Sequence, residues 1–136
     1  MLSMKAKYAI RALMVLAKHE GKTMQSKTIA KEADAPMKFL EAILLELKNE
    51  GLVASKRGIF GGYYLAKSAK AIMLGDVIRR IDGMLAPLRC ASVTSYEKCE
   101  DCADENKCAI RHAMQEVRNA ISGVLDKKTL AEMVRT

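Results

Sequence analysis

Residues 26–66 read SKTIAKEADAPMKFLEAILLELKNEGLVASKRGIFGGYYLA, and this stretch decides the fold. A short helix is predicted over 26–33, with its first serine placed to cap it. A turn at 34–35 follows, and a proline then opens a second helix over 36–49 that Gly51 ends. Two short helices joined by a tight turn are the unit that places its second helix in the major groove of DNA.

The second helix has two faces at helical spacing. The face predicted to pack on a core consists of Phe39, Leu40, Ile43, Leu44 and Leu47. The other face carries Lys38, Glu41, Ala42, Leu45 and Asn49. There Lys38 can reach a guanine or a phosphate, Glu41 can accept from a cytosine amino group, and apolar atoms can meet a thymine methyl. The helix pattern alone fits an ordinary amphipathic helix of an all-α core equally well.

A glycine-rich hairpin is predicted directly after this helix pair. The runs 52–55 and 63–66 have strand character, and KRGIFGG lies between them. Glycines permit positive φ, while Lys56 and Arg57 place cations at a tip that can contact phosphates or a narrow minor groove. The apolar pair 59–60 either makes further wing contacts or packs onto the domain. A basic hairpin in this place favours a winged helix over a plain all-α core.

The motifs together resemble the Rrf2 (BadM-type) family of winged-helix transcriptional regulators. The resemblance covers residues 3–134 and is sharpest in Gly51-Leu52-Val53-x-Ser55-x-Arg57-Gly58-x-x-Gly61-Gly62-Tyr63-x-Leu65-Ala66. It extends to SMKAKYAIRAL at 3–13, to Phe39-Leu40-Glu41-x-Ile43-Leu44-x-x-Leu47 and to residues 74–83. It implies a mainly α fold with a small β-hairpin wing and a long C-terminal dimerisation helix. It also implies a homodimeric repressor that binds double-stranded DNA at an inverted repeat.

The expected DNA-binding residues come from the first helix, the second helix of the pair and the wing. They are Lys5, Lys7, Tyr8, Met37, Lys38, Glu41, Ala42, Lys56 and Arg57.

The positive charge is confined to the first part of the chain. The 136 residues carry a formal net charge of +7; residues 1–83 hold 15 Lys and Arg against 8 Asp and Glu, and residues 84–136 hold 8 of each. The excess therefore lies with the predicted winged helix, as expected for a phosphate binder. No stretch reads as a bilayer-spanning segment or a cleavable signal, so the sequence predicts a cytoplasmic protein without a membrane partner.

The cysteines form a second motif. Cys90, Cys99, Cys102 and Cys108 are separated by 8, 2 and 5 residues, and no cysteine occurs elsewhere. Such a cluster in an intracellular protein more often binds metal or senses redox state than forms structural disulfides. Iron–sulfur clusters and zinc both take four thiolates, and the spacing fits neither a zinc ribbon nor a ferredoxin. Spacing by itself leaves iron–sulfur, zinc and redox-thiol hypotheses open.

The Rrf2 resemblance favours an iron–sulfur cluster, of the 2Fe-2S or the 4Fe-4S type. Cluster-binding members use three cysteines in this region, which correspond to Cys90, Cys102 and Cys108. The family's fourth ligand is often a histidine after the third cysteine or an acid of the first helix, and those places here hold an arginine and a lysine. Cys99 is therefore expected as the fourth ligand. Zinc stays as the alternative metal.

A long helix is predicted from Lys107 to about Asp126. Its apolar stripe comprises Ala109 or Ile110, Ala113, Val117, Ala120, Ile121, Val124 and Leu125. Such a stripe favours pairing with a second copy, and a twofold dimer would read an inverted repeat; the alternative is that it folds back on its own domain. The expected organisation is a winged helix over 1–83, a cysteine-bearing loop over 84–107, and a dimerisation helix with its tail over 108–136.

Other functional hypotheses find less support in the sequence. The best enzyme hypothesis is a thiol–disulfide oxidoreductase that uses Cys99 and Cys102. That motif normally opens a helix, which lowers the thiol pKa, whereas here it lies among acids that should raise it. A zinc-stabilised module that does not bind DNA and a regulator that switches through thiols without a cluster are the remaining alternatives.

Overall fold

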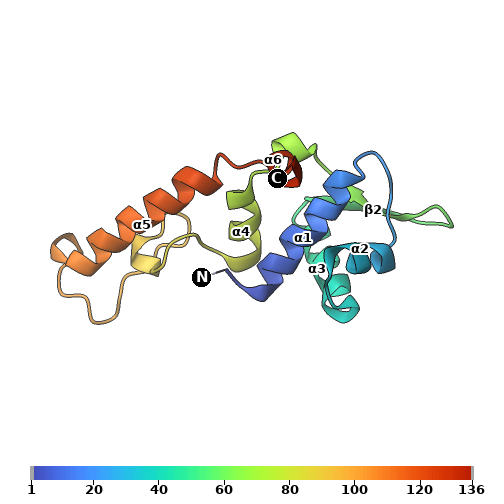
Figure 1. Ribbon diagram of the computed structural model, residues 1–136. Helices are drawn as coiled ribbons and strands as arrows, with labels where there is room; N and C mark the ends of the chain where they lie inside the picture. The colour runs from blue at the N-terminus through green and yellow to red at the C-terminus, as the bar shows by residue number, and fades with distance from the viewer. Residues whose placement is uncertain (1, 136) are drawn as a thin grey trace.

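The structure, a computed structural model, describes residues 2–135 and is mainly helical with one two-stranded antiparallel sheet (Figure 1). In chain order the helices and strands are α1 (Met4–Lys18), α2 (Ser26–Ala33), α3 (Met37–Asn49), β1 (Val53–Lys56), β2 (Gly62–Leu65), η1 (Ala69–Ala71), α4 (Leu74–Asp82), η2 (Arg89–Ala91), η3 (Glu105–Lys107), α5 (Ala109–Leu125) and α6 (Leu130–Arg135). The hairpin and α5 project from opposite ends of the body. Among the described helices none is both long and apolar enough to cross a membrane.

Helix α1 is the centre of the body and contacts α2, α3, α4, α6 and β2. Burial extends around more than one of its faces, beyond the single stripe expected from the sequence. Its buried residues are Ala6, Ala9, Ile10, Ala12, Leu13, Val15 and Leu16. The alanines allow neighbouring helices to approach closely, because a methyl group leaves little side chain between two backbones.

Ser3 fixes where α1 begins and ties it to the end of α4. Its hydroxyl oxygen accepts a hydrogen bond from the backbone N–H of Ala6 at 3.0 Å, which caps the helix. Its own backbone N–H donates to the Asp82 carboxylate at 3.0 Å, and its hydroxyl donates to the other oxygen of that carboxylate. The two helix ends are therefore joined by one side-chain pair.

Helices α2 and α3 form the predicted helix pair with small corrections. Asp34, the turn residue, adopts a left-handed conformation with φ of 51° and ends α2. Leu40, Ile43, Leu44 and Leu47 of α3 are buried as expected. The predicted cap of α2 is wrong, because Ser26 lies inside the helix and Gln25 precedes it without a side-chain cap. Phe39 is also not a core residue, since it is 59% exposed.

The predicted wing is confirmed as the hairpin of β1 and β2, paired from Val53 opposite Leu65 to Lys56 opposite Gly62. Met24 extends the pairing beyond the hairpin: its backbone N–H donates to the Tyr63 carbonyl at 2.9 Å, and the Tyr63 N–H donates back at 2.7 Å. Gly62 is required at this contact, because a Cβ there would lie 2.4 Å from the Met24 carbonyl oxygen. The wing is thus anchored to the chain that precedes α2.

Helices α5 and α6 behave differently although they follow one another. None of the described side chains of α5 is buried, and the helix extends away from the body. The chain then returns, and α6 packs on α1 with Leu130 in the core. Leu74 at the start of α4 donates its backbone N–H to the Lys128 carbonyl at 2.8 Å, which holds this return. Residues after α5 therefore belong structurally to the body.

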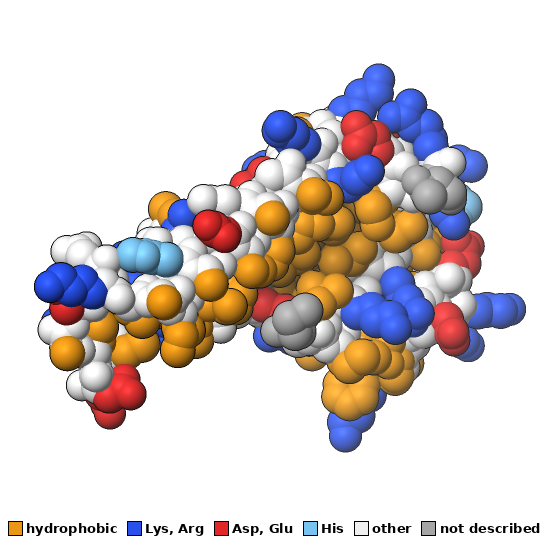
Figure 2. Space-filling model, turned by 60° about the vertical axis from the view of Figure 1, so that its left-hand side comes forward, with side chains coloured by type: hydrophobic (Ala, Val, Ile, Leu, Met, Phe, Trp, Pro, Cys, Tyr) orange, Lys and Arg blue, Asp and Glu red, His pale blue; other side chains and the backbone are white. Residues whose placement is uncertain are grey.

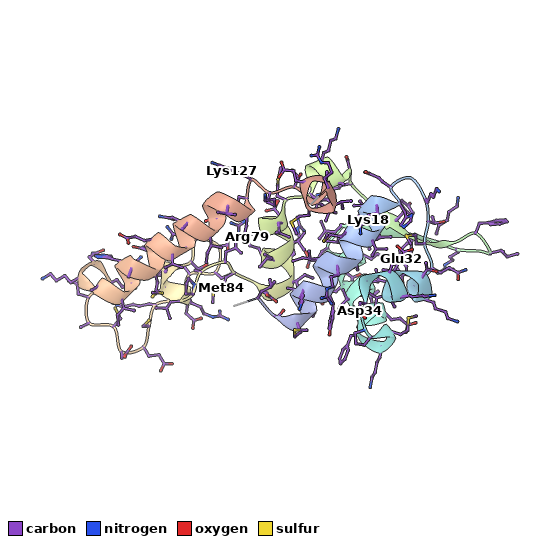
Figure 3. The ribbon with its side chains drawn as sticks, viewed as in Figure 1. Lys18, Glu32, Asp34, Arg79, Met84 and Lys127 are labelled. Atoms are coloured by element: carbon purple, nitrogen blue, oxygen red, sulfur yellow. The ribbon has the colours of Figure 1, made fainter. Side chains whose placement is uncertain are left out.

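An ion pair between α4 and the end of α5 sets the direction in which α5 leaves the body. The Arg79 guanidinium donates to both carboxylate oxygens of Asp126, at 2.7 and 2.8 Å (Figure 3 labels Arg79). Gly75 leaves room for this carboxylate, because a Cβ there would lie 2.1 Å from Asp126 Oδ1. The hydrogen bonds from Arg79 hold the pKa of Asp126 below its usual value.

The Arg79–Asp126 pair predicts an acid-dependent loss of stability. Because the pKa of Asp126 is lower in the folded than in the unfolded protein, the pair stabilises the fold above the unfolded-state pKa and loses this effect as the pH falls through the folded-state pKa. Asp126→Asn should lower the free energy of unfolding at neutral pH by at most about 1 kcal/mol, because both side chains are partly exposed. Urea unfolding against pH measures this difference, which should shrink in acid.

Glu116→Gln is the matched control, since Glu116 is an exposed acid of α5. It should leave the pH dependence of stability unchanged. A difference between Asp126→Asn and wild type that stays constant into acid would contradict the assignment.

Candidate functional site

The outer face of α3 is exposed and carries the residues predicted to contact base edges. Lys38, Glu41 and Ala42 are exposed, and Met37 at the start of the helix is 37% exposed. Leu45, one turn further along, is 56% exposed. A helix face that mixes a cation, a carboxylate, a methyl group and a leucine offers donors, an acceptor and apolar contacts to base edges.

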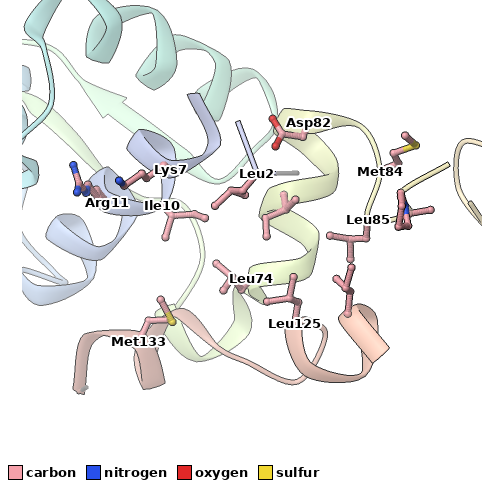
Figure 4. A pocket seen from close by; sticks show the side chains of 14 residues that line it. Leu2, Lys7, Ile10, Arg11, Leu74, Asp82, Met84, Leu85, Leu125 and Met133 are labelled. Atoms are coloured by element: carbon pink, nitrogen blue, oxygen red, sulfur yellow. The ribbon is translucent and has the colours of Figure 1, made fainter. Parts of the chain in front are cut away.

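The candidate residues of α1 do not share one surface. Lys5 lies toward α3, where its ammonium group donates to Glu46 at 3.2 Å. Lys7 lies on another side of α1 and lines a hollow between α1 and α4 (Figure 4). Tyr8 is half-buried, with the Arg11 guanidinium 6.0 Å from its ring centre. Lys5 therefore contacts α3 directly, Lys7 lies away from it, and the DNA-binding roles of all three residues stay predictions.

The wing presents both of its predicted cations. Lys56 and Arg57 are exposed at the end of β1. The backbone of the tip is held from the side, because the Thr23 hydroxyl donates to the Phe60 carbonyl at 2.9 Å. Ile59 and Phe60 do not pack onto the domain, since each is 88% exposed.

The cysteines lie in the loop between α4 and α5, in different environments. Cys90 is buried in η2, Cys99 is exposed, and Cys102 and Cys108 are half-buried. A hydrogen bond with Cys90 raises the pKa of the Cys99 thiol, and the nearby Asp101 adds to the shift. This raised pKa is the opposite of what a thiol–disulfide oxidoreductase needs at its attacking cysteine.

The donors suit a metal centre in kind but are not gathered in space. Four thiols are the donor set that iron–sulfur clusters and zinc take. Within residues 2–135, however, no three Cys, His, Asp or Glu side chains are placed to share an ion. The segment between η2 and η3 has no regular secondary structure and is mostly exposed, so it has room to rearrange around a ligand.

Two arginines of α5 hold the turn that carries Cys90. Arg111 donates from Nε to the Cys90 carbonyl at 2.9 Å, and its backbone N–H donates to the Cys108 thiol at 3.4 Å. Arg118 donates from Nη1 to the Ala91 carbonyl at 2.6 Å. The position of Cys90 is thereby tied to α5. The sequence pointed to this role only in that Arg111 occupies the place of a family ligand.

An apolar surface runs from α5 into a hollow at its base. Ile110 and Val124 of α5 are 66% and 61% exposed, and Val117 is 40% exposed. Hydrophobic side chains continue from this helix toward the body in Figure 2. They end in a hollow of about 440 Å³ (Figure 4). The hollow is lined by residues of α1, α4, α5 and α6 and by the loop that follows α4. Its apolar lining includes Ile10, Leu74, Ile78, Leu85, Leu125 and Met133.

Comparison with known proteins gives the family. The family model described as "Rrf2: Iron-dependent Transcriptional regulator" matches residues 2–136. This chain belongs to the Rrf2 family. The predicted family and the winged-helix fold are both confirmed, and this Rrf2 protein is a DNA-binding transcriptional regulator and not an enzyme.

Relatives and solved structures of the Rrf2 family match this chain over nearly its whole length. A Rhodobacter capsulatus protein whose name describes an rrf2-like HTH-type transcriptional regulator is 40% identical, over 98% of this chain and 92% of that protein. IscR of Yersinia pseudotuberculosis is 33% identical, over 98% of this chain and 78% of IscR. The structure of CymR, the global cysteine regulator of B. subtilis, superposes with a TM-score of 0.81 at 32% identity, covering 99% of this chain and 96% of that chain.

Sequence reasoning missed one residue at the surface of α3. Phe39 lies at the edge of the apolar stripe and is exposed beside the reading face. Its place at the margin of the stripe, rather than at its centre, was the available signal. An exposed aromatic ring there adds apolar surface next to Lys38 in this Rrf2 protein.

Proposed function

We propose that this Rrf2 protein is a homodimeric repressor that reads an inverted repeat with α3 and the wing, and whose DNA affinity is set by an iron–sulfur cluster on its four cysteines. The observation that carries the DNA-reading part is the exposed face of α3 beside a basic, anchored hairpin. Lys38 and Glu41 project from α3, and Lys56 and Arg57 from the wing. These residues lie in the part of the chain that holds all of the excess positive charge.

Base reading and phosphate binding divide between the two elements. Lys38, Glu41 and Ala42 on α3 contact base edges in the major groove, because a helix of this diameter fits that groove. Lys56 and Arg57 contact phosphates or the adjacent minor groove and fix the orientation of the protein. Lys5 has a second partner available in DNA phosphate, for which it gives up its contact with Glu46.

Dimer formation follows from the unburied stripe of α5. A helix that buries none of its described side chains on its own body has an apolar stripe that gains stability by packing on something else. The stripe continues into an apolar hollow on the body, so a second copy of α5 has both a helix and a hollow to cover. Two identical chains paired in this way present two α3 helices related by a twofold axis, which suits an inverted repeat.

Cluster binding is supported by the donor set and by the contacts that lead from it. Cys90, Cys99, Cys102 and Cys108 would hold the cluster, whose thiolate bonds supply sensitivity to iron, oxidant or nitric oxide. Loop residues must first move to bring the four thiols together, because no three Cys, His, Asp or Glu side chains among residues 2–135 are placed to share an ion in this structure. Arg111 carries that movement to α5, since it contacts both Cys90 and Cys108. A change in the loop thus alters the placement of the dimer helix and of the two α3 helices.

A thiol switch without a cluster is the second candidate, favoured by the hydrogen bond between Cys90 and Cys99. In that case hydrogen peroxide takes two protons and two electrons from the two thiols, one disulfide forms, and the peroxide leaves as two waters. The consequence for α5 is the same, because the Cys90 turn is bound to Arg111 and Arg118.

Arg57→Ala tests the wing. Loss of a base-edge contact should weaken binding to a selected operator by about 1–3 kcal/mol, whereas loss of a phosphate contact should weaken it by less and make its salt dependence shallower. Fluorescence anisotropy across a salt series measures both quantities. Lys107→Ala removes an exposed cation of the cysteine loop and serves as control. Wild-type affinity in Arg57→Ala would exclude the wing from DNA binding.

Glu41→Ala tests reading by α3. The carboxylate repels phosphate and accepts from cytosine, so its removal should leave affinity for random DNA equal or higher and should reduce the preference among sites. Competition between the operator and single-base variants measures this preference. Glu116→Ala on α5 is the control for a general gain in positive charge. Full selectivity in Glu41→Ala would show that this carboxylate does not read bases.

Val117→Glu with Val124→Glu tests the dimer. Both side chains are exposed in the isolated chain, so the variant should fold normally. It should sediment as a monomer and bind the inverted repeat far more weakly than wild type. Asn119→Glu adds a charge on the polar side of α5, where a carboxylate still accepts from Arg118, and should stay dimeric. A dimeric double-valine variant would reject the stripe as the interface.

Cysteine-to-serine variants test the cluster. Anaerobically purified wild type should contain iron and sulfide and absorb visible light, and each single variant at Cys90, Cys102 or Cys108 should lose most of that absorption, because each removes a ligand. Val93→Ser in the same loop is the control. The cluster would be rejected if the wild type contained zinc without iron or sulfide. It would also be rejected if a variant with Cys90, Cys102 and Cys108 all replaced kept its visible absorption. The thiol switch is supported instead if the protein contains no metal and its mass falls by that of two hydrogen atoms on treatment with hydrogen peroxide.

A further inference from the structure

The tip of the wing carries an apolar pair with no partner in its own chain. Ile59 and Phe60 are each 88% exposed, more than any other large hydrophobic residue that the structure describes. They directly follow Lys56, Arg57 and Gly58. Exposing adjacent isoleucine and phenylalanine to water is unfavourable, so a surface that covers them is expected.

The backbone beneath this pair is held in place. Gly61 donates its N–H to the Gly58 carbonyl at 3.0 Å and closes the turn, and a Cβ at Gly61 would lie 2.2 Å from the Lys56 carbonyl oxygen. The Thr23 hydroxyl donates to the Phe60 carbonyl at 2.9 Å from outside the hairpin. The two side chains are therefore displayed on a braced turn at the projecting end of the molecule (Figure 1). The backbone of the turn therefore needs little further ordering when the two side chains bind.

The charge around the tip identifies what covers it. Residues 51–75 contain Lys56, Arg57, Lys67 and Lys70 and no Asp or Glu. Binding to an apolar protein surface would not require this excess of positive charge, whereas binding to a polyanion does. Duplex DNA offers both a line of phosphates and, inside the minor groove, apolar sugar edges and base steps that accept isoleucine or phenylalanine.

We propose that Ile59 and Phe60 form an apolar wedge that enters the minor groove beside the α3 site and partly unstacks one base step there. This rests on the proposed DNA reading by α3 and the wing. Lys56 and Arg57 bind the phosphates on either side of the step, and Phe60 contacts the opened bases. Since pyrimidine–purine steps unstack most easily, the wedge selects such a step at the flank of each half-site without reading its base edges.

The test uses the full-length protein and a selected operator duplex with 2-aminopurine at successive flanking positions. Wild type should raise 2-aminopurine fluorescence at one position in each half-site and should bend the duplex, measured by energy transfer between its ends. Phe60→Ser should lose both signals and bind about tenfold more weakly, with an unchanged salt dependence, because aromatic stacking and not charge is removed. Phe60→Leu keeps an apolar wedge and should retain the bend.

Val93→Ser is the control for loss of an exposed hydrophobic residue outside the wing. Replacing the pyrimidine–purine step at which the fluorescence rises by a stiff AA step should weaken binding by wild type and not by Phe60→Ser. Selective binding by wild type with no fluorescence change and no bend overturns the wedge and leaves the proposed function standing. Equal affinity and bending in Phe60→Ser and wild type also overturns it. Absence of selective DNA binding by wild type overturns the proposed function and the wedge together.

Discussion

The burial of α1 is the constraint on which the rest of the structure depends. Almost every element of the body packs on this one helix, and its alanines let them do so at short range. The orientation of α3 follows, since Leu40 and Leu44 must reach the same core and the opposite face of α3 is then left to solvent. The anchor of the wing at Met24 follows as well, because Met24 is buried in that core. Reading helix and wing are thus placed by one packing requirement.

The placement of α5 is governed by polar contacts rather than by burial. Helix α5 has no core of its own, and its direction is set where Asp126 meets Arg79 beside Gly75. A partly exposed ion pair is worth far less than a hydrophobic core. The body should therefore remain folded under changes that move α5. That separation suits the proposed regulation, in which the distance between the two α3 helices of a dimer would change.

The cysteine loop is connected to this movable part and not to the core of the body. Arg111 and Arg118 bind the turn around Cys90 from α5, and Cys108 caps the same helix. Ligand binding or oxidation in the loop would act first on α5. The acidic residues of the loop would keep it away from DNA phosphate. The cysteine loop and the exposed face of α3 thus lie in separate parts of the structure, and α4 contacts both α1 and α5 between them.

The sequence by itself determined the helix pair, the wing and the exposed face of α3, because residue spacing and turn residues within 26–66 specify them. It also determined the family, because motifs along the chain resemble those of other members. It could not determine contacts between segments far apart. Only the tertiary structure exposed Phe39, returned α6 to α1 and bound the Cys90 turn to Arg111 and Arg118. Those outcomes depend on how helices cross, and a helical pattern shows which residues share a face but not which neighbour covers its edges.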